Sequence, residues 1–327
     1  SLVGSSGTGK STLLRIIAGL EEPSAGRVTY AGQPLERGSV GVVFQRPILY
    51  PHLSMKDNIL FPTRLGAFAG RVDMDYYREL LEALKLEGLE PRKPSQLSGG
   101  QAQRVGIARA LIRRAPVVLF DEPLASVDEE LSASIRADIA RLHAEYRFTG
   151  LYVTHDQNEA LQLGQRVAVM DAGYLVQVDT PEHLLANPHT LQAARLTASP
   201  ALNELTLTEG QHLPEGASLY VRATSLRRVE SIAEHPTENT IPVQIQSVLP
   251  QVGGTLYRAV TQAEVTLYAA SHDGSVRVPL QVSGGQPLEF FEPDALALPV
   301  LTSGQRAQVQ VPPHHCFIFA DGTRHYL

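Results

Sequence analysis

The chain has 327 residues, 43% of them apolar and 19% charged, and its 34 acidic side chains outnumber 28 basic ones for a formal net charge of −6. At roughly 100–200 residues per domain, this length predicts two domains, each large enough to bury a core. The acidic balance, with no block of like charges, argues against a nucleic-acid-binding protein and against a disordered tail. A single cysteine, Cys316, excludes an intrachain disulfide and argues against a structural zinc site. No apolar run approaches the roughly 20 residues that cross a bilayer and no signal peptide opens the sequence, so we expect a soluble protein.

The first part of the chain predicts a parallel sheet covered by helices. Short, nearly continuous apolar runs alternate with helical patterns, which is typical of strands buried on both faces of an α/β domain. The expected strands are Val40–Phe44, Val117–Phe120, Leu151–Thr154 and Val167–Met170, and the expected helices are Lys10–Leu20, Gln101–Arg114 and Glu129–Arg147.

The pattern changes near residue 195. Beyond it, short strands are interrupted by glycine and proline, which predicts a small antiparallel barrel or sandwich. We therefore expect an α/β domain over residues 1–195 and an all-β domain over residues 200–327. The expected strands of the second domain include Ser218–Arg222, Ile241–Val248, Thr255–Val260, Glu264–Ala269 and Ala307–Val311.

A glycine-rich loop near the start matches the pattern G-x-x-x-x-G-K-[ST], between an apolar stub and a helix. It reads Gly4-Ser5-Ser6-Gly7-Thr8-Gly9-Lys10-Ser11-Thr12. Glycines let successive backbone N–H groups surround a phosphate, and the helix N-terminus adds partial positive charge. Lys10 is expected to reach the β- and γ-phosphates of a nucleotide, and the Ser11 hydroxyl to bind Mg²⁺. The alternative is a chance glycine-rich turn, at about 1 in 100 for a chain of this length.

Two carboxylates, Asp121 and Glu122, end the apolar strand that begins at Val117. Ligands of open parallel sheets bind beyond the carboxyl ends of the strands, so these acids are expected beside the phosphate loop. Asp121 suits Mg²⁺ coordination through water, and Glu122 suits polarising an attacking water. On its own, this pair is equally well explained as a polar strand end that enters a turn at Pro123.

A second glycine-rich element, Ser98-Gly99-Gly100-Gln101, opens another helix. Ser98 and Gln101 have the spacing of a capping box, which is the purely structural explanation. A cap does not need two glycines in the first turn, where each costs about 1 kcal/mol relative to alanine. Close approach of an anion explains them better, and because the chain already has a phosphate loop, the nucleotide of a second copy is the expected anion.

Together these motifs resemble the nucleotide-binding subunit of ABC transporters. The order and spacing match that family from Gly4 to about Ala186, through GSSGTGKST, Gln45, LSGGQ, VVLFDEP, Ser126-Val127-Asp128 and His155. The resemblance implies a P-loop NTPase fold and a head-to-tail homodimer that holds two ATP molecules. Each ATP would lie between the phosphate loop of one copy and Ser98, Gly99, Gly100 and Gln101 of the other.

The same resemblance assigns three further residues. Gln45 is the lid glutamine that contacts Mg²⁺ and the attacking water, Asp128 belongs to the loop that crosses the dimer interface, and His155 contacts the γ-phosphate. Without that context a histidine or glutamine at a strand end is more often polar surface. His155 follows an apolar strand, and Asp156 and Glu159 are spaced to cap the next helix, which puts the imidazole at the same sheet edge as Asp121 and Glu122.

Residues 46–115 would form an inserted helical subdomain. By resemblance, its first part receives two transmembrane permease subunits near residues 46–55, with an extracytoplasmic solute-binding protein acting indirectly. Apolar and aromatic residues occur there, from Pro47 to Leu53. Ordinary packing within the subdomain is the alternative. The protein would then lie peripherally on the cytoplasmic face of the inner membrane.

The C-terminal part resembles importer ATPases of the MalK, spermidine and ferric-iron groups, in which an OB-like (TOBE-type) β domain follows the ATPase domain. The resemblance rests on residues 180–188, 199–203 and the closing 316–324, which look like the end of a complete chain. Dimer contacts and regulation are the expected roles of this domain, with a plain scaffold as the alternative. The family's leading segment, whose aromatic side chain stacks on adenine, is not in this sequence, so we expect ATP binding several-fold weaker and lower stability than with it.

We therefore expect an ATPase that energises a bacterial importer. Glu122 would polarise the water, Mg²⁺ would be held by Ser11, Gln45 and, through water, Asp121, and the γ-phosphate charge would be stabilised by cationic and polar groups. Sugars, polyols or glycerol phosphates are the first expected solutes, and polyamines, ferric iron or other inorganic ions the second. An ABC-type ATPase acting on DNA or ribosomes, and an ATP-binding regulatory dimer without turnover, are the competing hypotheses.

Overall fold

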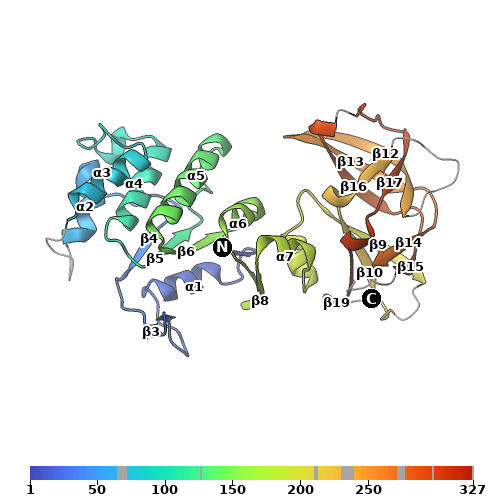
Figure 1. The fold of residues 1–327 in the computed structure, drawn as a ribbon, viewed down its shortest axis with the longest axis horizontal. Helices are drawn as coiled ribbons and strands as arrows, with labels where there is room; N and C mark the ends of the chain where they lie inside the picture. The colour runs from blue at the N-terminus through green and yellow to red at the C-terminus, as the bar shows by residue number, and fades with distance from the viewer. Residues whose placement is uncertain are drawn as a thin grey trace. The chain divides into compact units, whose positions relative to one another are not determined.

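The computed structural model describes residues 1–64, 72–125, 127–209, 213–229, 239–270, 277–296 and 298–325. The chain forms two compact units, Ser1–Pro181 and Glu182–Leu327 (Figure 1). Each unit has its own hydrophobic core.

A six-stranded sheet organises the first unit, in the order β4-β5-β6-β1-β7-β8. The strands are β1 (Leu2–Gly4), β4 (Val40–Val43), β5 (Val117–Asp121), β6 (Thr149–Thr154), β7 (Val167–Asp171) and β8 (Tyr174–Asp179). All neighbours pair in parallel except β7 and β8, which form an antiparallel hairpin. Because β1 lies between β6 and β7, the loop that follows β1 emerges at the same edge as the ends of β4, β5 and β6.

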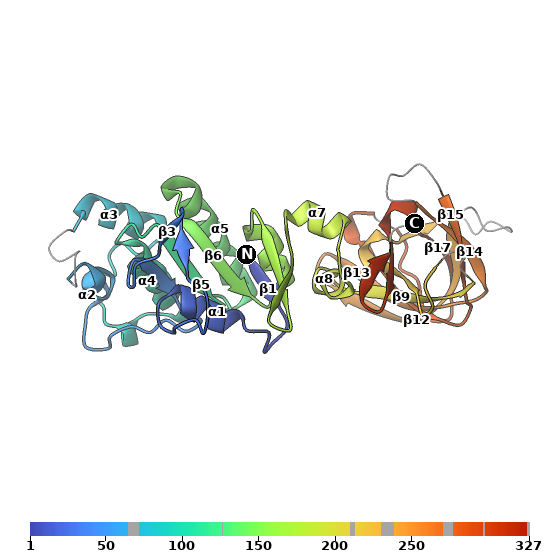
Figure 2. The same ribbon diagram turned by 90° about the horizontal axis from the view of Figure 1, so that it is seen from below.

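Helices cover both faces of this sheet (Figures 1 and 2). On one face, Leu14 of α1 (Lys10–Ile17) packs with Leu2 and Leu119. On the other, α5 (Glu129–Tyr146) contributes a row of buried apolar residues at helical spacing, Ile135, Ile139 and Leu142. The helix α6 (Gln157–Leu163) follows β6. The predicted fold class, a parallel α/β core followed by antiparallel β structure, is confirmed.

The range 46–115 contains α2 (Met55–Leu60), α3 (Met74–Ala83) and α4 (Gly99–Leu111), with short 3-10 turns at Phe61–Arg64 and Pro94–Gln96. Residues 65–71 of this predicted subdomain lie outside the described residues. Buried residues of all three helices join one core with β4 and β5. A short hairpin of β2 (Thr29–Tyr30) and β3 (Gln33–Pro34), which the sequence did not predict, lies between α1 and β4.

The second unit contains two antiparallel sheets with the orders β14-β15-β9-β10-β18-β19 and β11-β17-β12-β13-β16. Apolar residues of both sheets form a single core, among them Leu205 and Val221 from the first and Ile241 and Phe290 from the second. The strands are β9 (Leu202–Glu209), β10 (Ser218–Arg222), β11 (Arg227–Val229), β12 (Thr240–Gln251), β13 (Gly254–Thr261), β14 (Val265–Ala270), β15 (Arg277–Val282), β16 (Pro287–Pro293), β17 (Arg306–Gln310), β18 (Cys316–Ala320) and β19 (Thr323–His325), with 3-10 turns at Ala223–Ser225, Asp294–Leu296 and Pro313–His315.

The division between the units lies earlier than the change of composition near residue 195. The helices α7 (Pro181–Ala186) and α8 (Leu191–Leu196) pack with the β structure, because the buried Arg222 of β10 donates hydrogen bonds to the carbonyls of Leu185 (3.1 Å) and Ala194 (3.3 Å). Ala194 also shares a small core with Tyr220. Composition does not show which unit α7 and α8 belong to, because a short helix has the same pattern of apolar residues whichever unit it packs against. The helices within the described ranges are all too short or too polar to span a lipid bilayer.

Candidate nucleotide-binding site

The phosphate loop, the strand-end glutamate and the strand-end histidine line one cavity of about 350 Å³ in the first unit. Four parts of the chain therefore contribute to it: the β1–α1 loop, the first turn of α1, and the residues that directly follow β5 and β6. The lining residues are Ser6, Gly7, Gly9, Lys10, Ser11, Thr12, Glu122 and His155.

The loop takes the conformation that its glycines allow. Gly7 (φ 81°) and Gly9 (φ 97°) are both left-handed, a region that other residues enter at a cost. The Thr8 hydroxyl donates to the Ser5 carbonyl at 2.9 Å and closes the turn from inside. At the start of α1 there is no side-chain cap and no acidic residue in the first turn. The N-terminal N–H groups of α1 therefore carry partial positive charge that no side chain of this helix neutralises, as an anion site requires.

Lys10 is held beneath the loop, only 6% exposed. Its Nζ donates to the carbonyls of Gly4 and Ser5, both at 2.8 Å. Burial lowers the pKa of Lys10, and the nearby carboxylates of Glu122 and Asp121 oppose that shift. An ammonium group placed here supplies the charge that a nucleotide's terminal phosphates need.

The two acids differ in what surrounds them. Glu122 has a left-handed backbone (φ 43°), its N–H donates to the Val153 carbonyl at 2.9 Å, and its Oε2 lies 3.0 Å from His155 Nδ1. A non-glycine residue in this conformation is strained, and such strain often occurs where a side chain must be aimed. Burial and the charge of Glu122 raise the pKa of Asp121, while Lys10 lowers it. A second positive charge near Asp121 would therefore stabilise its ionised form.

Gln45 is exposed and does not line the cavity. It lies two residues beyond Val43, the register partner of Phe120, so it occupies the sheet edge next to Asp121. A buried glutamine of α4, Gln103, donates from Nε2 to the Phe44 carbonyl at 3.3 Å and fixes the chain just before Gln45. The structure thus brings Glu122 and His155 together with the loop, and leaves Gln45 beside them.

Comparison with known proteins assigns the family. Residues 1–125 match the family model described as ABC transporter. The sn-glycerol-3-phosphate import ATP-binding protein UgpC of Paraburkholderia xenovorans is 35% identical over an alignment that covers 94% of this chain and 90% of that protein. This chain belongs to the ABC transporter ATP-binding family. It is an ATP-hydrolysing transport ATPase.

Further relatives agree. The UgpC protein of Escherichia coli K12 is 41% identical over 64% of this chain, and the alignment spans 62% of that protein. Among solved structures, CbiO1 of Clostridium perfringens, a part of the ABC transporter complex CbiONQ, is 28% identical with a TM-score of 0.51, covering 57% of this chain and 78% of that one.

The residues of this ABC ATPase fit a magnesium ion at the cavity. The Ser11 hydroxyl is exposed in the first turn of α1, and the Asp121 carboxylate lies close enough to Lys10 and Glu122 to feel their charges. These are oxygen donors, which hard cations prefer. The described part of the chain contains no group of three or more histidine, cysteine or acidic residues that could hold a metal ion.

The signature segment Ser98–Gln101 does not line the cavity of its own chain. The capping box is present: Gln101 N–H donates to Ser98 Oγ (3.2 Å) and Ser98 N–H to Gln101 Oε1 (3.0 Å). Gly99 is exposed, with open space where a Cβ would lie. Gly100 is buried, and a Cβ on it would lie 2.3 Å from Leu131 Cδ2. A Cβ at position 100 would therefore make Leu131 shift, so packing inside the chain is a second reason for a glycine there. The approach of an anion to both glycines stays a prediction.

Asp128 is the N-cap of α5, where its Oδ1 accepts from the Leu131 N–H at 2.9 Å. Its side chain is exposed and is absent from the cavity lining. The neighbouring Ser126 lies outside the described residues. Of the residues that the sequence assigned to the opposite copy, Ser98, Gly99 and Asp128 are exposed and Gly100 is buried. None of them lines the cavity of its own chain.

The sequence prediction was incomplete at Glu159. Asp156 caps α6 alone, with its Oδ1 accepting from the N–H groups of Asn158 (2.7 Å) and Glu159 (3.1 Å). The Glu159 carboxylate turns inward and accepts from the hydroxyls of Thr154 (2.8 Å) and Tyr152 (3.0 Å). A helix N-terminus with two acids looks the same in sequence whichever acid caps it, so only the structure reveals the second role.

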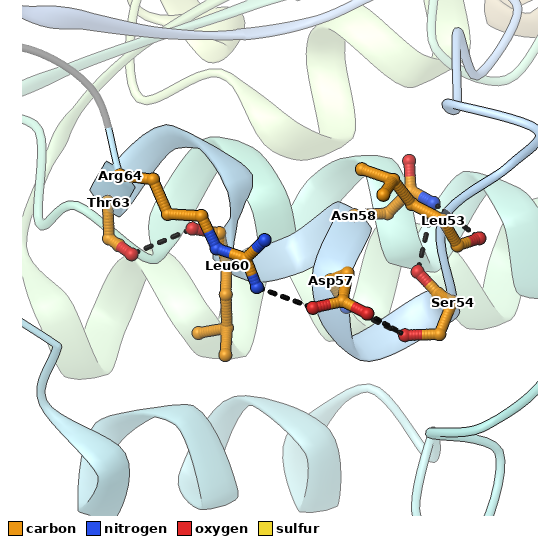
Figure 3. A network of polar contacts seen from close by, with 7 residues as sticks. All are labelled: Leu53, Ser54, Asp57, Asn58, Leu60, Thr63 and Arg64. Atoms are coloured by element: carbon orange, nitrogen blue, oxygen red, sulfur yellow. Dashed lines mark hydrogen bonds and ion pairs between the residues drawn. The ribbon is translucent and has the colours of Figure 1, made fainter.

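The segment after Gln45 exposes Ile48 (63%) and Tyr50 (38%) beside an apolar cavity of about 400 Å³. Buried Asn58 of α2 fixes this segment: its Oδ1 accepts from Tyr50 N–H (2.7 Å) and its Nδ2 donates to the carbonyls of Tyr50, Leu53 and Ser54. Figure 3 shows Asn58 and the neighbouring Asp57, which Ser54 and Arg64 contact from either side. The cavity is lined by Ala18, Leu20, Gly38, Val40, Gly41, Val42, Phe44, Ile48, Tyr50, Phe61, Pro62, Arg109, Ala110, Arg113 and Ala115.

Proposed function

We propose that this ATPase energises import of a small hydroxylated solute, with sn-glycerol 3-phosphate as the first candidate and sugars or polyols next. The solute class comes from the names of the relatives, which are glycerol-3-phosphate import proteins over most of this chain. The observation that carries the chemistry is the cavity shared by Lys10, Glu122 and His155.

The nucleotide's phosphates would lie against the loop and the N-terminus of α1. Backbone N–H groups and the Lys10 ammonium, released from the Gly4 and Ser5 carbonyls or shared with them, would neutralise the terminal phosphates. When bound, Mg²⁺ neutralises charge on the β- and γ-phosphate oxygens. Ser11, Gln45 and Asp121 are the residues that would hold it.

Glu122 would orient and polarise the water that attacks the γ-phosphate in line. Its backbone N–H donates to the Val153 carbonyl, and its carboxylate lies 3.0 Å from His155 Nδ1. His155 would place its other ring nitrogen against the γ-phosphate, where a donor stabilises the charge that spreads over the equatorial oxygens. Positioning and electrostatics thus supply most of the catalysis, as phosphoryl transfer needs.

A homodimer would complete each site. Ser98, Gly99, Gly100 and Gln101 lie at a helix N-terminus that is exposed from Ser98 to Gly99, and Asp128 lies at another. None lines the cavity of its own chain, which suits a contribution to the second copy's ATP. Turnover would then depend on pairing.

Permease subunits would dock on the segment around Ile48 and Tyr50 and hold the protein on the cytoplasmic face of the inner membrane. The exposed side chains and the adjoining apolar cavity suit an apolar helix of the permease. A solute-binding protein outside the membrane would act through the permease alone.

The test is reconstitution of the full transporter in vesicles with MgATP inside. We expect uptake of sn-glycerol 3-phosphate coupled to phosphate release, and no uptake when the Glu122→Gln subunit is used. Maltose serves as the comparison solute. Uptake of maltose in preference to glycerol phosphate would overturn the solute assignment, and uptake without phosphate release would overturn the energising role.

A further inference from the structure

A buried carboxylate, Glu159, lies directly behind the segment that presents His155. Glu159 is in the first turn of α6 and is 7% exposed, while Thr154 and Tyr152, whose hydroxyls donate to its Oε2, are 2% and 5% exposed. Its Oε1 lies 3.7 Å from Arg136 Nη1 of α5, in an ion pair with little solvent contact. Buried charges are retained when they are paired and hydrogen-bonded, as this one is.

A chain of hydrogen bonds links the Glu159 carboxylate to Thr154 and Asp156, the two sequence neighbours of His155. The Thr154 hydroxyl donates to Glu159 Oε2 at 2.8 Å and accepts from the Asp156 N–H at 2.9 Å. One residue earlier, the Val153 carbonyl accepts from Glu122 N–H. The backbone on either side of the histidine is therefore tied to fixed partners.

The imidazole itself has little packing to orient it. The His155 side chain is 62% exposed, and its Nδ1 contacts Glu122, whose side chain is 24% exposed. With so much of the ring exposed, the direction of the imidazole depends on its own backbone as well as on the contact with Glu122. The backbone from Thr154 to Asp156 is in turn fixed by the Thr154 hydroxyl, which Glu159 holds in the orientation that accepts from Asp156.

We infer that Glu159 is a positioning residue that sets the direction of His155 toward the γ-phosphate through the Thr154 hydroxyl. Helix capping does not account for this carboxylate, because Asp156 caps α6 by itself. The inference rests on the proposed function, since it concerns how the γ-phosphate is contacted. The inference predicts that disrupting this contact weakens the interactions with the γ-phosphate and leaves the rest of nucleotide binding unchanged.

The decisive pair of variants is Thr154→Val and Thr154→Ser. Valine has nearly the shape of threonine but lacks the hydroxyl, whereas serine keeps it. Affinities are measured for ADP and for a non-hydrolysable ATP analogue, and kcat for ATP. For Thr154→Val we expect about a tenfold or larger fall in kcat and a loss of preference for the analogue over ADP, since small misplacements of a reacting group have effects of this order. Thr154→Ser and the surface control Glu82→Gln should match the wild type.

A second cycle asks whether the effect acts through the histidine. In a His155→Ala background, adding Thr154→Val should leave kcat and the analogue-to-ADP affinity ratio unchanged, because the group being positioned is gone. Glu159→Ala is the direct variant, and it leaves Arg136 without this carboxylate. Should it fail to fold, the threonine pair alone decides.

The outcomes separate this inference from the proposed function. A wild-type chain that binds no nucleotide or releases no phosphate contradicts the proposed function. A wild type that turns over ATP while Thr154→Val keeps full kcat and full selectivity overturns the positioning role. Equal weakening of ADP and analogue binding, or the same factor in the His155→Ala background, overturns it as well, since a merely structural defect has that signature.

Discussion

Leu131, at the start of α5, packs on Gly100 in the first turn of α4, so closely that a Cβ on the glycine would lie 2.3 Å from Leu131 Cδ2. The Leu131 N–H also donates to Asp128, the N-cap of α5. The two segments proposed to reach the opposite copy, Ser98–Gln101 and Asp128, are therefore joined through one leucine.

Because of this contact, we expect alanine substitutions at the adjacent Gly99 and Gly100 to change stability in opposite directions. Gly100→Ala forces Leu131 to move, at an overpacking cost of about 1–3 kcal/mol, against roughly 1 kcal/mol gained from helix propensity, so the net change is a loss of up to about 2 kcal/mol. Gly99→Ala meets open space, so its stability should equal or slightly exceed that of the wild type. Denaturant unfolding measures both. Turnover should fall in both variants if the segment meets a second nucleotide, and an unaffected Gly99→Ala turnover would contradict that role.

Glu122→Gln should bind ATP with wild-type affinity and trap a dimer, with turnover lower by about 10²–10⁴-fold, the usual contribution of a general base. Glutamine has the same backbone preferences as glutamate at φ 43°, so the strain is unchanged and the fold should be too. Size-exclusion chromatography with MgATP and a phosphate-release assay measure the two effects. Sustained turnover would exclude Glu122 as the group that activates water.

Lys10→Met should lose at least about tenfold in nucleotide affinity while remaining folded, since a charge-assisted hydrogen bond contributes about 1.5–3 kcal/mol. Two carbonyls lose their donor. The loss of these hydrogen bonds is offset by removal of a buried charge. Burial lowers the pKa of Lys10, which means that folding disfavours its charged form. Equilibrium binding of a fluorescent ATP analogue and a thermal melt form the test. A large fall in melting temperature with unchanged affinity would reverse the assignment.

A pH effect is expected in the second unit at Glu292, whose carboxylate lies 3.0 Å from Arg228 with both side chains under 10% exposed. Burial raises the pKa of Glu292 above its usual 4.5, although Arg228 opposes the shift. With the folded pKa above the unfolded one, the stability contributed by this group is present below pH 4.5 and is lost as pH rises through the folded pKa. Glu292→Gln should therefore be more stable than the wild type at pH 7.5, with the difference vanishing toward pH 4. Thermal melts across this range decide, and lower stability of the variant at pH 7.5 would mean that the ion pair dominates.

The segment proposed to meet the permease should loosen in Asn58→Asp. A carboxylate cannot donate to the carbonyls of Tyr50, Leu53 and Ser54. The carbonyls of Tyr50 and Ser54 keep the backbone N–H groups of Leu53 and Asn58, whereas the Leu53 carbonyl loses this donor, at a cost of about 1–3 kcal/mol. Hydrogen exchange should rise in residues 50–54 while exchange in β5 is unaffected. Lys56→Gln, at an exposed position of the same helix, changes the net charge by the same amount and is the matched control. Unchanged exchange would show that packing, rather than Asn58, holds the segment.

The strands and helices of the α/β core were predictable from local sequence. Short apolar runs indicate buried strands, and apolar residues at helical spacing indicate the buried face of a helix. Helix ends were less predictable: α1 stops at Ile17 rather than Leu20, because Gly19 turns left-handed (φ 71°), and α4 begins at Gly99, because Ser98 caps it. The β7–β8 pairing and the place of α7 and α8 also depended on contacts between distant segments.

By itself the sequence determined which chemical groups the site contains, since the loop glycines, Lys10, the paired acids and His155 are identified by residue type and by position at strand ends. Only the tertiary structure decided their relations: that Glu122 turns to His155, that Glu159 lies behind Thr154, and that Gly100 makes room for Leu131. The physical reason is that residue spacing specifies direction along one helix or strand. Distances between side chains of different elements follow from how those elements pack, which no local pattern encodes.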